Sequence, residues 1–204
     1  MLAALTGTGL SAAAGLNAYI PFLIVALTAR FTDVLTLPSE FAWIESNWAI
    51  GLAAVLLLSE TVLDKIAIID HLNDALGTFI RPATGGLIFA ATQAAADLER
   101  ESSFMQDNPW IGVVAGVVTA GIMHSGKALT RPFVNGTTMG MGAPVVSAAE
   151  DGASLGLSLI AIFLPILVIF ALIGVFWLLV ATWRRSRRKQ KYRDTAMAAA
   201  GYYS

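Results

Sequence analysis

Long apolar runs with few charged residues alternate with short polar stretches along the whole chain. The runs occupy about Leu2–Leu27, Trp48–Leu63, Pro82–Ala96, Trp110–Leu129 and Ser154–Trp183. As a helix, the last run would be about 45 Å long, more than the ~30 Å of a bilayer's hydrocarbon core. The pattern predicts an all-α integral membrane protein, a bundle of about five (four to six) transmembrane helices. We expect broken or re-entrant segments where a run is short or contains proline.

Two prolines and one short run mark where such irregular segments are expected. Pro165 lies inside the last run and predicts a bend there. Asn17 and Pro21 lie inside the first run and are typical of a helix that breaks and turns freed backbone groups toward a cavity. An ordinary hydrogen bond between helices is the alternative role for Asn17. The run from Pro82 to Ala96 is short for a full crossing and is the candidate for a re-entrant segment.

Composition agrees with the membrane class. Hydrophobic residues make up 56% of the 204 residues and charged residues only 13%, with a mean hydropathy of +0.70. A soluble domain usually has about 25% charged residues. The chain has no cysteine, which excludes disulfides, thiolate chemistry and cysteine metal sites.

Positive charge is concentrated after the last apolar run. Of the 13 lysine and arginine residues, seven lie between Arg184 and Arg193. Basic residues flanking a span favour the cytoplasmic side. We therefore predict a polytopic transmembrane domain over 1–183 and a basic cytoplasmic tail over 184–204. The glycine-rich stretch Asn135–Gly152 is predicted on the opposite side, as an external loop or as an unwound segment that presents N–H groups to an anion.

A shift of 62 residues aligns one half of the chain with the other. It places Trp48 on Trp110, Lys65 on Lys127, and Pro82 on Pro144. This predicts an internal duplication with repeats at about 46–98 and 108–160. Repeats of this kind are common in transporters, where sites form between the halves.

Three stretches carry a resemblance to a known family. They are GLSAAAGLNAYIPFLIVAL, ETVLDKIAIIDHLNDALGTFIRP and KALTRPFVNGTTMGMGAPVVSAAED. Together they resemble a family of small bacterial membrane proteins catalogued as domain of unknown function 4126. The similarity extends from Leu2 to about Val180 and leaves out the basic tail. It implies a helical membrane fold in a bacterial cytoplasmic (inner) membrane and brings no activity with it.

The stretch GIMHSGK, from Gly121 to Lys127, matches the phosphate-loop pattern G-x-x-x-x-G-K. A working phosphate loop follows a strand and continues with a Ser or Thr that holds magnesium, whereas Ala128 follows here. We interpret the match as coincidence and expect no nucleotide and no nucleic acid as partner. Gly121 and Gly126 are interpreted as small residues that allow close helix packing.

Charged and amide side chains next to or within apolar runs are the candidate functional residues. A charge at the centre of a membrane helix costs on the order of 2.5–3.5 kcal/mol, so it usually has a partner or a role. The candidates for substrate binding or translocation are Asn17, Glu60, Asp64, Lys65, Asp70, Arg81, His124, Lys127, Arg131, Glu150 and Asp151.

Helical spacing predicts how these residues are arranged. His124 with Lys127, Lys127 with Arg131, and Glu60 with Asp64 share helix faces at i, i+3 or i, i+4. We expect Lys127 to pair with Glu60 or Asp64. Glu150 and Asp151 just precede the last run, where carboxylates suit a helix N-terminus. The paired charges have two interpretations: they hold the helices together, or they line a polar cavity that binds a solute.

The leading functional hypothesis is a transporter or channel-like protein for a small polar or anionic solute. The alternative is a non-catalytic accessory subunit of a larger respiratory or cell-envelope membrane complex. We expect the lipid bilayer as a partner, together with a homo-oligomer or a larger complex. Catalytic residues, metal sites and cofactors are not expected, because the two histidines have no H-E-x-x-H spacing. An intramembrane enzyme acting on lipid phosphates stays open as a further possibility.

Overall fold

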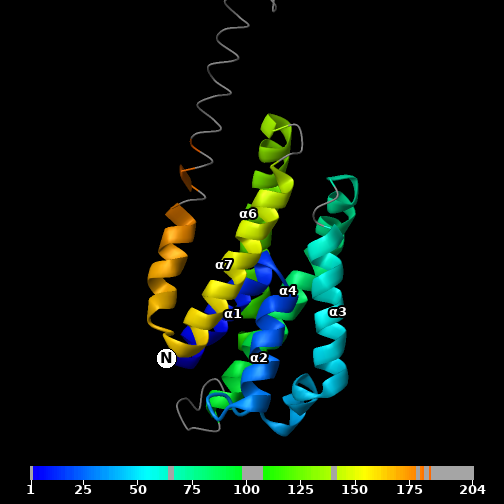
Figure 1. Ribbon diagram of the computed structural model, residues 1–204. Coiled ribbons are helices and arrows are strands. Elements are labelled where there is room, and N and C mark those ends of the chain that lie inside the picture. Colours follow the sequence, from blue (N-terminus) through cyan, green and yellow to red (C-terminus); the bar gives the residue numbers. More distant parts are fainter. Residues whose placement is uncertain are drawn as a thin grey trace, which may run out of the picture. The chain divides into compact units, whose positions relative to one another are not determined.

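The computed structural model describes residues 2–63, 67–97, 108–138, 142–177, 180–181 and 184. Within these, the side chains of residues 67–74, 93–97, 109, 129–138 and 143 are not described. The chain forms two compact units, Met1–Ile169 and Phe170–Ser204, and the helices α1 to α7 belong to the first. Every regular element in the described residues is helical, which confirms the all-α fold (Figure 1).

The helix boundaries follow the apolar runs with several differences. The helices are α1 Leu2–Leu16, α2 Tyr19–Phe31, the short 3-10 helix η1 Ser39–Glu45, α3 Asn47–Leu63, α4 Ala67–Asp97, α6 Pro109–Thr138 and α7 Ala143–Phe163. A further apolar helix covers Leu167–Trp177. The first run is thus two helices with a break at residues 17–18, as Asn17 and Pro21 predicted.

Two of the predicted boundaries are wrong. The third helix begins at Ala67, not near Pro82, so Pro82 lies inside a helix of 31 residues. The stretch Asn135–Gly152 is largely helical and not a loop, because α6 extends to Thr138 and α7 begins at Ala143. The polar residues of α7 do not stop that helix, because Glu150, Asp151 and Ser154 contact α6 and the α1–α2 junction.

The break predicted at Pro165 is confirmed. Helix α7 ends at Phe163, and Leu164 has a non-helical backbone. The amide of Leu167 then donates to the carbonyl of Leu164 and starts the next helix. The long uncharged run is therefore two helical pieces.

Fewer helices than predicted have the length and composition of a membrane span. Trp110–Ala128 and Pro144–Phe163 pass that test, and η1 with α3 makes a third if this pair, bent by 53°, is one span. Helices α1, α2 and Leu167–Trp177 are apolar but shorter. Among the described residues, two or three helices are thus long and apolar enough to cross a membrane, and the bundle of about five spans is not confirmed.

The predicted duplication is not tested by the helix boundaries. Residues 64–66, which follow α3 in the first proposed repeat, lie outside the described residues. The duplication therefore stays a prediction.

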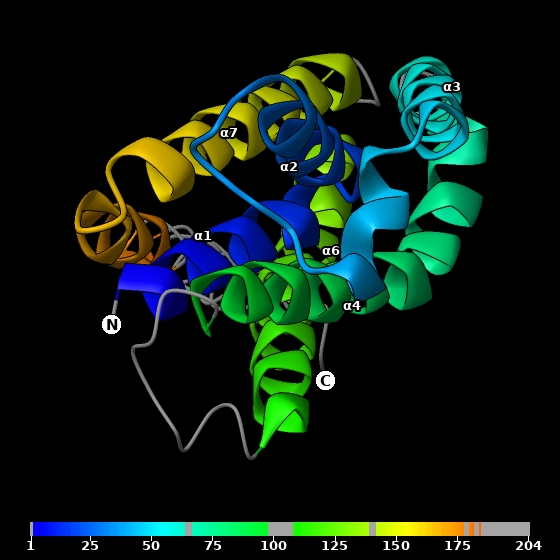
Figure 2. The same ribbon diagram turned by 90° about the horizontal axis from the view of Figure 1, so that it is seen from below.

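The core forms where α1, α4 and α6 pack together, with α7 on the other side of α1 (Figure 2). Small residues let these helices approach closely. A Cβ added at Gly116 would collide with the carbonyl oxygen of Gly85, and one at Gly15 would collide with that of Ala120. The packing role predicted for Gly121 is wrong, because a Cβ there would meet nothing within 4 Å.

Exposure is inverted relative to a water-soluble protein. Leu58 on α3 is 67% exposed and Ile122 on α6 is 64% exposed, whereas Arg81 is 1% exposed and Lys127 4%. Large apolar side chains are exposed along α3, α6 and α7, including Val55, Val62, Trp110, Val118, Leu155 and Phe163. Soluble monomers rarely expose apolar surface on this scale.

Candidate functional site

The site is built around the break between α1 and α2. Pro21 has no N–H with which to bond the carbonyl four residues earlier, and its ring crowds that carbonyl, which belongs to Asn17. The side-chain oxygen of Asn17 accepts hydrogen bonds from the amides of Tyr19 (3.0 Å) and Ile20 (3.2 Å). Asn17 thereby caps the start of α2.

The same hydrogen bonds free the carbonyl of Leu16 at the end of α1. Because the Ile20 amide is taken by Asn17, the carbonyl of Leu16 is available to a side chain. The Lys127 ammonium donates to it at 3.1 Å. The Ser154 hydroxyl lies 3.0 Å from the carbonyl of Ala13 and 3.5 Å from that of Asn17. A cation at the C-terminal end of a helix is also favoured by the helix dipole.

Helix α7 presents two neighbouring carboxylates to this break. The Lys127 ammonium forms an ion pair with Glu150 at 2.9 Å, and its side chain is 2% exposed against 12% for that of Glu150. The amide nitrogen of Asn17 donates to the Asp151 carboxylate at 2.8 Å. Helix α7 is thus tied to α6 by charge and to the α1–α2 junction by a hydrogen bond.

Arg81 is the centre of the second half of the site. Its guanidinium forms an ion pair with Glu60 of α3 at 2.7 Å and lies 2.8 Å from Nδ1 of His124 on α6. The other ring nitrogen of His124, Nε2, lies 3.1 Å from the Thr78 hydroxyl. A guanidinium only donates, so Nδ1 must accept and the proton of a neutral ring sits on Nε2. Gly77 makes room, since a Cβ there would lie 3.0 Å from the Arg81 guanidinium carbon.

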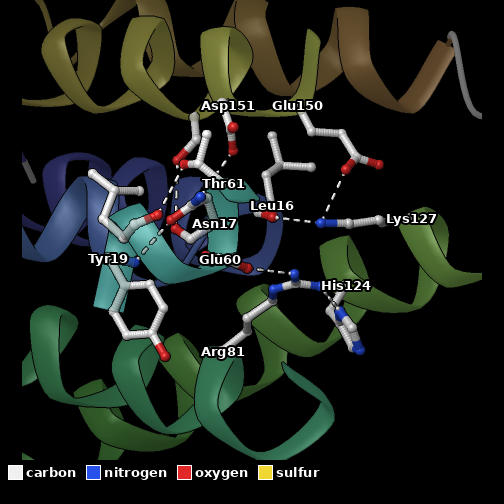
Figure 3. Close-up of polar contacts among 12 residues, drawn as sticks. Leu16, Asn17, Tyr19, Glu60, Thr61, Arg81, His124, Lys127, Glu150 and Asp151 are labelled. Carbon is white, nitrogen blue, oxygen red and sulfur yellow. Dashed lines mark hydrogen bonds and ion pairs between the residues drawn. The ribbon is translucent and has the colours of Figure 1, made fainter. Parts of the chain in front are cut away.

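The two halves meet on α6, where His124 and Lys127 are one turn apart (Figure 3). Seven of the predicted residues therefore gather in one largely buried polar cluster, contributed by the α1–α2 junction, α3, α4, α6 and α7. We call these residues the charge cluster: Asn17, Glu60, Arg81, His124, Lys127, Glu150 and Asp151. Asp64 and Lys65 lie outside the described residues, and the side chains of Asp70 and Arg131 are not among those described.

The structure gives Lys127 the partner Glu150 and gives Glu60 the partner Arg81, two contacts that the sequence did not predict. The predicted pairing of Lys127 with Asp64 is not tested, because Asp64 lies outside the described residues. The predicted position of Glu150 and Asp151 was wrong. Because α7 begins at Ala143, they lie two turns inside the helix and act through side-chain contacts, not at its N-terminus.

Some contributors were missed by sequence reasoning. Three groups were missed: the hydroxyls of Thr78 and Ser154, which carry no charge, and the backbone carbonyl of Leu16. Thr78 precedes Arg81 by three positions, a helical spacing that signals a shared face. Nothing in the sequence marks the carbonyl of Leu16, because it lacks its usual helical donor only when the Asn17 side chain accepts the hydrogen bond from the Ile20 amide.

The residues that match the phosphate-loop pattern do not form a loop in the structure. Gly121–Lys127 lies wholly within α6, where backbone amides are engaged in the helix and do not form a cradle. Among the described residues, no three His, Asp or Glu side chains gather as a metal site would require. We therefore assign no metal ligand in the charge cluster.

Comparison with known proteins gives one result. Residues 4–185 match the model of a family described as a domain of unknown function, DUF4126, and the chain belongs to this family. Neither the curated proteins nor the solved structures contain a match to the chain. The expected family membership is confirmed, and the charge cluster lies wholly within the matched region.

Proposed function

We propose that this protein is a multi-pass protein of the bacterial inner membrane, with a cytoplasmic C-terminus, that moves a small polar or anionic solute through the charge cluster. The observation that carries the proposal is the burial of four titratable side chains from α3, α4 and α6 at a break in a helix. They are Glu60, Arg81, His124 and Lys127. Buried charge is expensive and is kept in membrane helices mainly for function.

The inverted exposure supports the membrane part of the proposal. Exposed leucine, valine and tryptophan side chains on α3, α6 and α7 suit contact with lipid, and they surround a polar interior. Helices α1 and α2 are each short, but a discontinuous helix crosses a membrane in two pieces if protein packs around its break. On this basis we propose five spans: the pair α1 and α2, the pair η1 and α3, and the single helices α4, α6 and α7.

The broken helix supports the transport part. In many transporters, discontinuous helices place carbonyl oxygens and helix termini at a central site for ions and substrates. Here the carbonyl of Leu16 and the Glu150 carboxylate hold the Lys127 ammonium. Glu150 is the more exposed partner of this pair. An anionic group of a solute would compete with Glu150 for Lys127 by the same chemistry.

The test is transport by the purified protein in liposomes. We expect uptake of at least one solute from a panel of inorganic ions, organic anions, small polar solutes and phospholipids. Protein-free liposomes and liposomes with heat-denatured protein are the controls. If no solute in the panel moves faster than in these controls, the proposal is wrong.

A second candidate function is that of an accessory subunit of a larger respiratory or cell-envelope membrane complex. It is favoured by the ion pairing itself, because Glu60 with Arg81 and Lys127 with Glu150 neutralise each other without a solute. A subunit of this kind should co-purify in fixed stoichiometry with a defined partner in mild detergent. A monodisperse homo-oligomer that still transports would reject this alternative.

A further inference from the structure

A groove lies on the first unit beside the charge cluster, between α2, α3 and α7. Its volume is about 350 Å³, at the small end of the range for ligand pockets. Aliphatic side chains make most of its wall: Ile20, Leu23 and Ile24 of α2, Leu57 of α3 and Leu155 of α7. The wall suits an alkyl chain.

One charged side chain lines this apolar groove. Asp151 of α7 lies in its wall, and its Oδ1 accepts the amide hydrogen of Asn17 at 2.8 Å. That partner is neutral, whereas the neighbouring Glu150 is paired with the Lys127 ammonium. The Asp151 carboxylate therefore places a negative charge on an apolar surface. The attraction of a cation to this charge is stronger there than in water, because the dielectric constant is lower.

The groove has unfilled space next to this carboxylate. Gly152 also lines it, and a Cβ added at Gly152 would meet nothing within 4 Å. A larger side chain at this position would enter the groove without displacing the helices. Gly156, one turn further along α7, is likewise open but does not line the groove.

We propose that this groove binds a lipophilic ammonium, an alkyl chain carrying a protonated amine, with the ammonium on Asp151 and the chain along α2 and Leu155. Charge complementarity selects this ligand class. A lipid headgroup whose ammonium is joined to a phosphate fits less well, because the phosphate would lie near the carboxylates of both Glu150 and Asp151. The binding does not depend on the proposed transport function.

The test measures equilibrium binding of radiolabelled decylammonium to the protein in nanodiscs of zwitterionic lipid, with empty nanodiscs subtracted. Asp151→Asn keeps an oxygen that accepts the hydrogen bond from Asn17 but removes the charge. We expect it to weaken binding about tenfold or more, as loss of a charge-assisted contact does. Gly152→Leu should abolish saturable binding by filling the groove, and its matched control Gly156→Leu should bind as the wild type does.

Two competitors identify the part of the probe that is recognised. Unlabelled decanol and decanoate should displace the probe at least about tenfold less well than unlabelled decylammonium does. The proposal is overturned if the wild type binds no more than empty nanodiscs. It is also overturned if Asp151→Asn and Gly152→Leu both bind as the wild type does, or if decanol competes equally. Failure of transport in liposomes would leave this result unaffected, so the two proposals are tested separately.

Discussion

At the scale of single residues, the fold depends on exchanges of hydrogen bonds around Asn17. Its side-chain oxygen accepts hydrogen bonds from the amides of Tyr19 and Ile20. The carbonyl of Leu16 is then available to accept a hydrogen bond from the Lys127 ammonium. One amide side chain thus converts a helix break into a binding position for an ammonium group. The ion pair of Lys127 with Glu150 then links α6 to α7 at that position.

The first prediction concerns this ion pair. Lys127→Met leaves the Glu150 carboxylate without its cation in a poorly hydrated place, and breaking a buried pair costs roughly 3–5 kcal/mol. We expect a clear loss of thermal stability in detergent. Adding Glu150→Gln should restore much of it, because removing both charges of a buried pair is often nearly neutral.

Ser125→Ala on the exposed face of α6 is the matched control and should change stability by about 0.5 kcal/mol at most. If Lys127→Met unfolds at the same temperature as the wild type, Lys127 is not a buried ion-pair partner.

The second prediction concerns the proton on His124. Arg81 can only donate to Nδ1, so we expect a neutral ring with its proton on Nε2, facing Thr78. Nitrogen-15 NMR of histidine-labelled protein separates the two ring nitrogens, and the chain has only one other histidine. A protonated Nδ1 near neutral pH would contradict the assigned contact with Arg81.

At the scale of helices, close packing depends on a few glycines, and these give the third prediction. A Cβ at Gly116 would collide with the Gly85 backbone and lie 2.8 Å from Cβ of Phe89. Gly116→Ala should destabilise by roughly 1–3 kcal/mol, as overpacking does. Gly121→Ala on the same helix meets open space and should stabilise by roughly 0.5–1 kcal/mol. Thermal unfolding of the two variants in one detergent makes the comparison, and equal stability would refute the close contact of α4 with α6.

The sequence predicts the helical elements better than their boundaries. The breaks at Asn17 and Pro165 were predictable because proline removes a local hydrogen bond. The extension of α6 to Thr138 and the start of α7 at Ala143 were not, since polar and glycine residues next to an apolar run are also typical of a loop. For the same reason the sequence found Lys127 and Glu150 but not their pairing, which depends on contact between α6 and α7.

At the scale of the whole molecule, the proposed orientation places the basic tail in the cytoplasm. The fourth prediction is that cysteine at Thr137, near the end of α6, is labelled by an impermeant reagent in intact cells, while cysteine at Ser186 is not. The absence of native cysteine leaves each introduced thiol as the sole target. Labelling at Ser186 with protection at Thr137 would reverse the orientation.

The fifth prediction separates a structural charge cluster from a transport site. The double variant Lys127→Met with Glu150→Gln should regain much of the stability lost in Lys127→Met but should carry no solute, because the ammonium that receives an anionic group is gone. The most direct measurement is solute flux in liposomes for the wild type and this double variant, at equal amounts of folded protein. We predict flux in the wild type and none in the double variant. Equal flux in both, or none in either, would contradict the assignment of the charge cluster as the transport site.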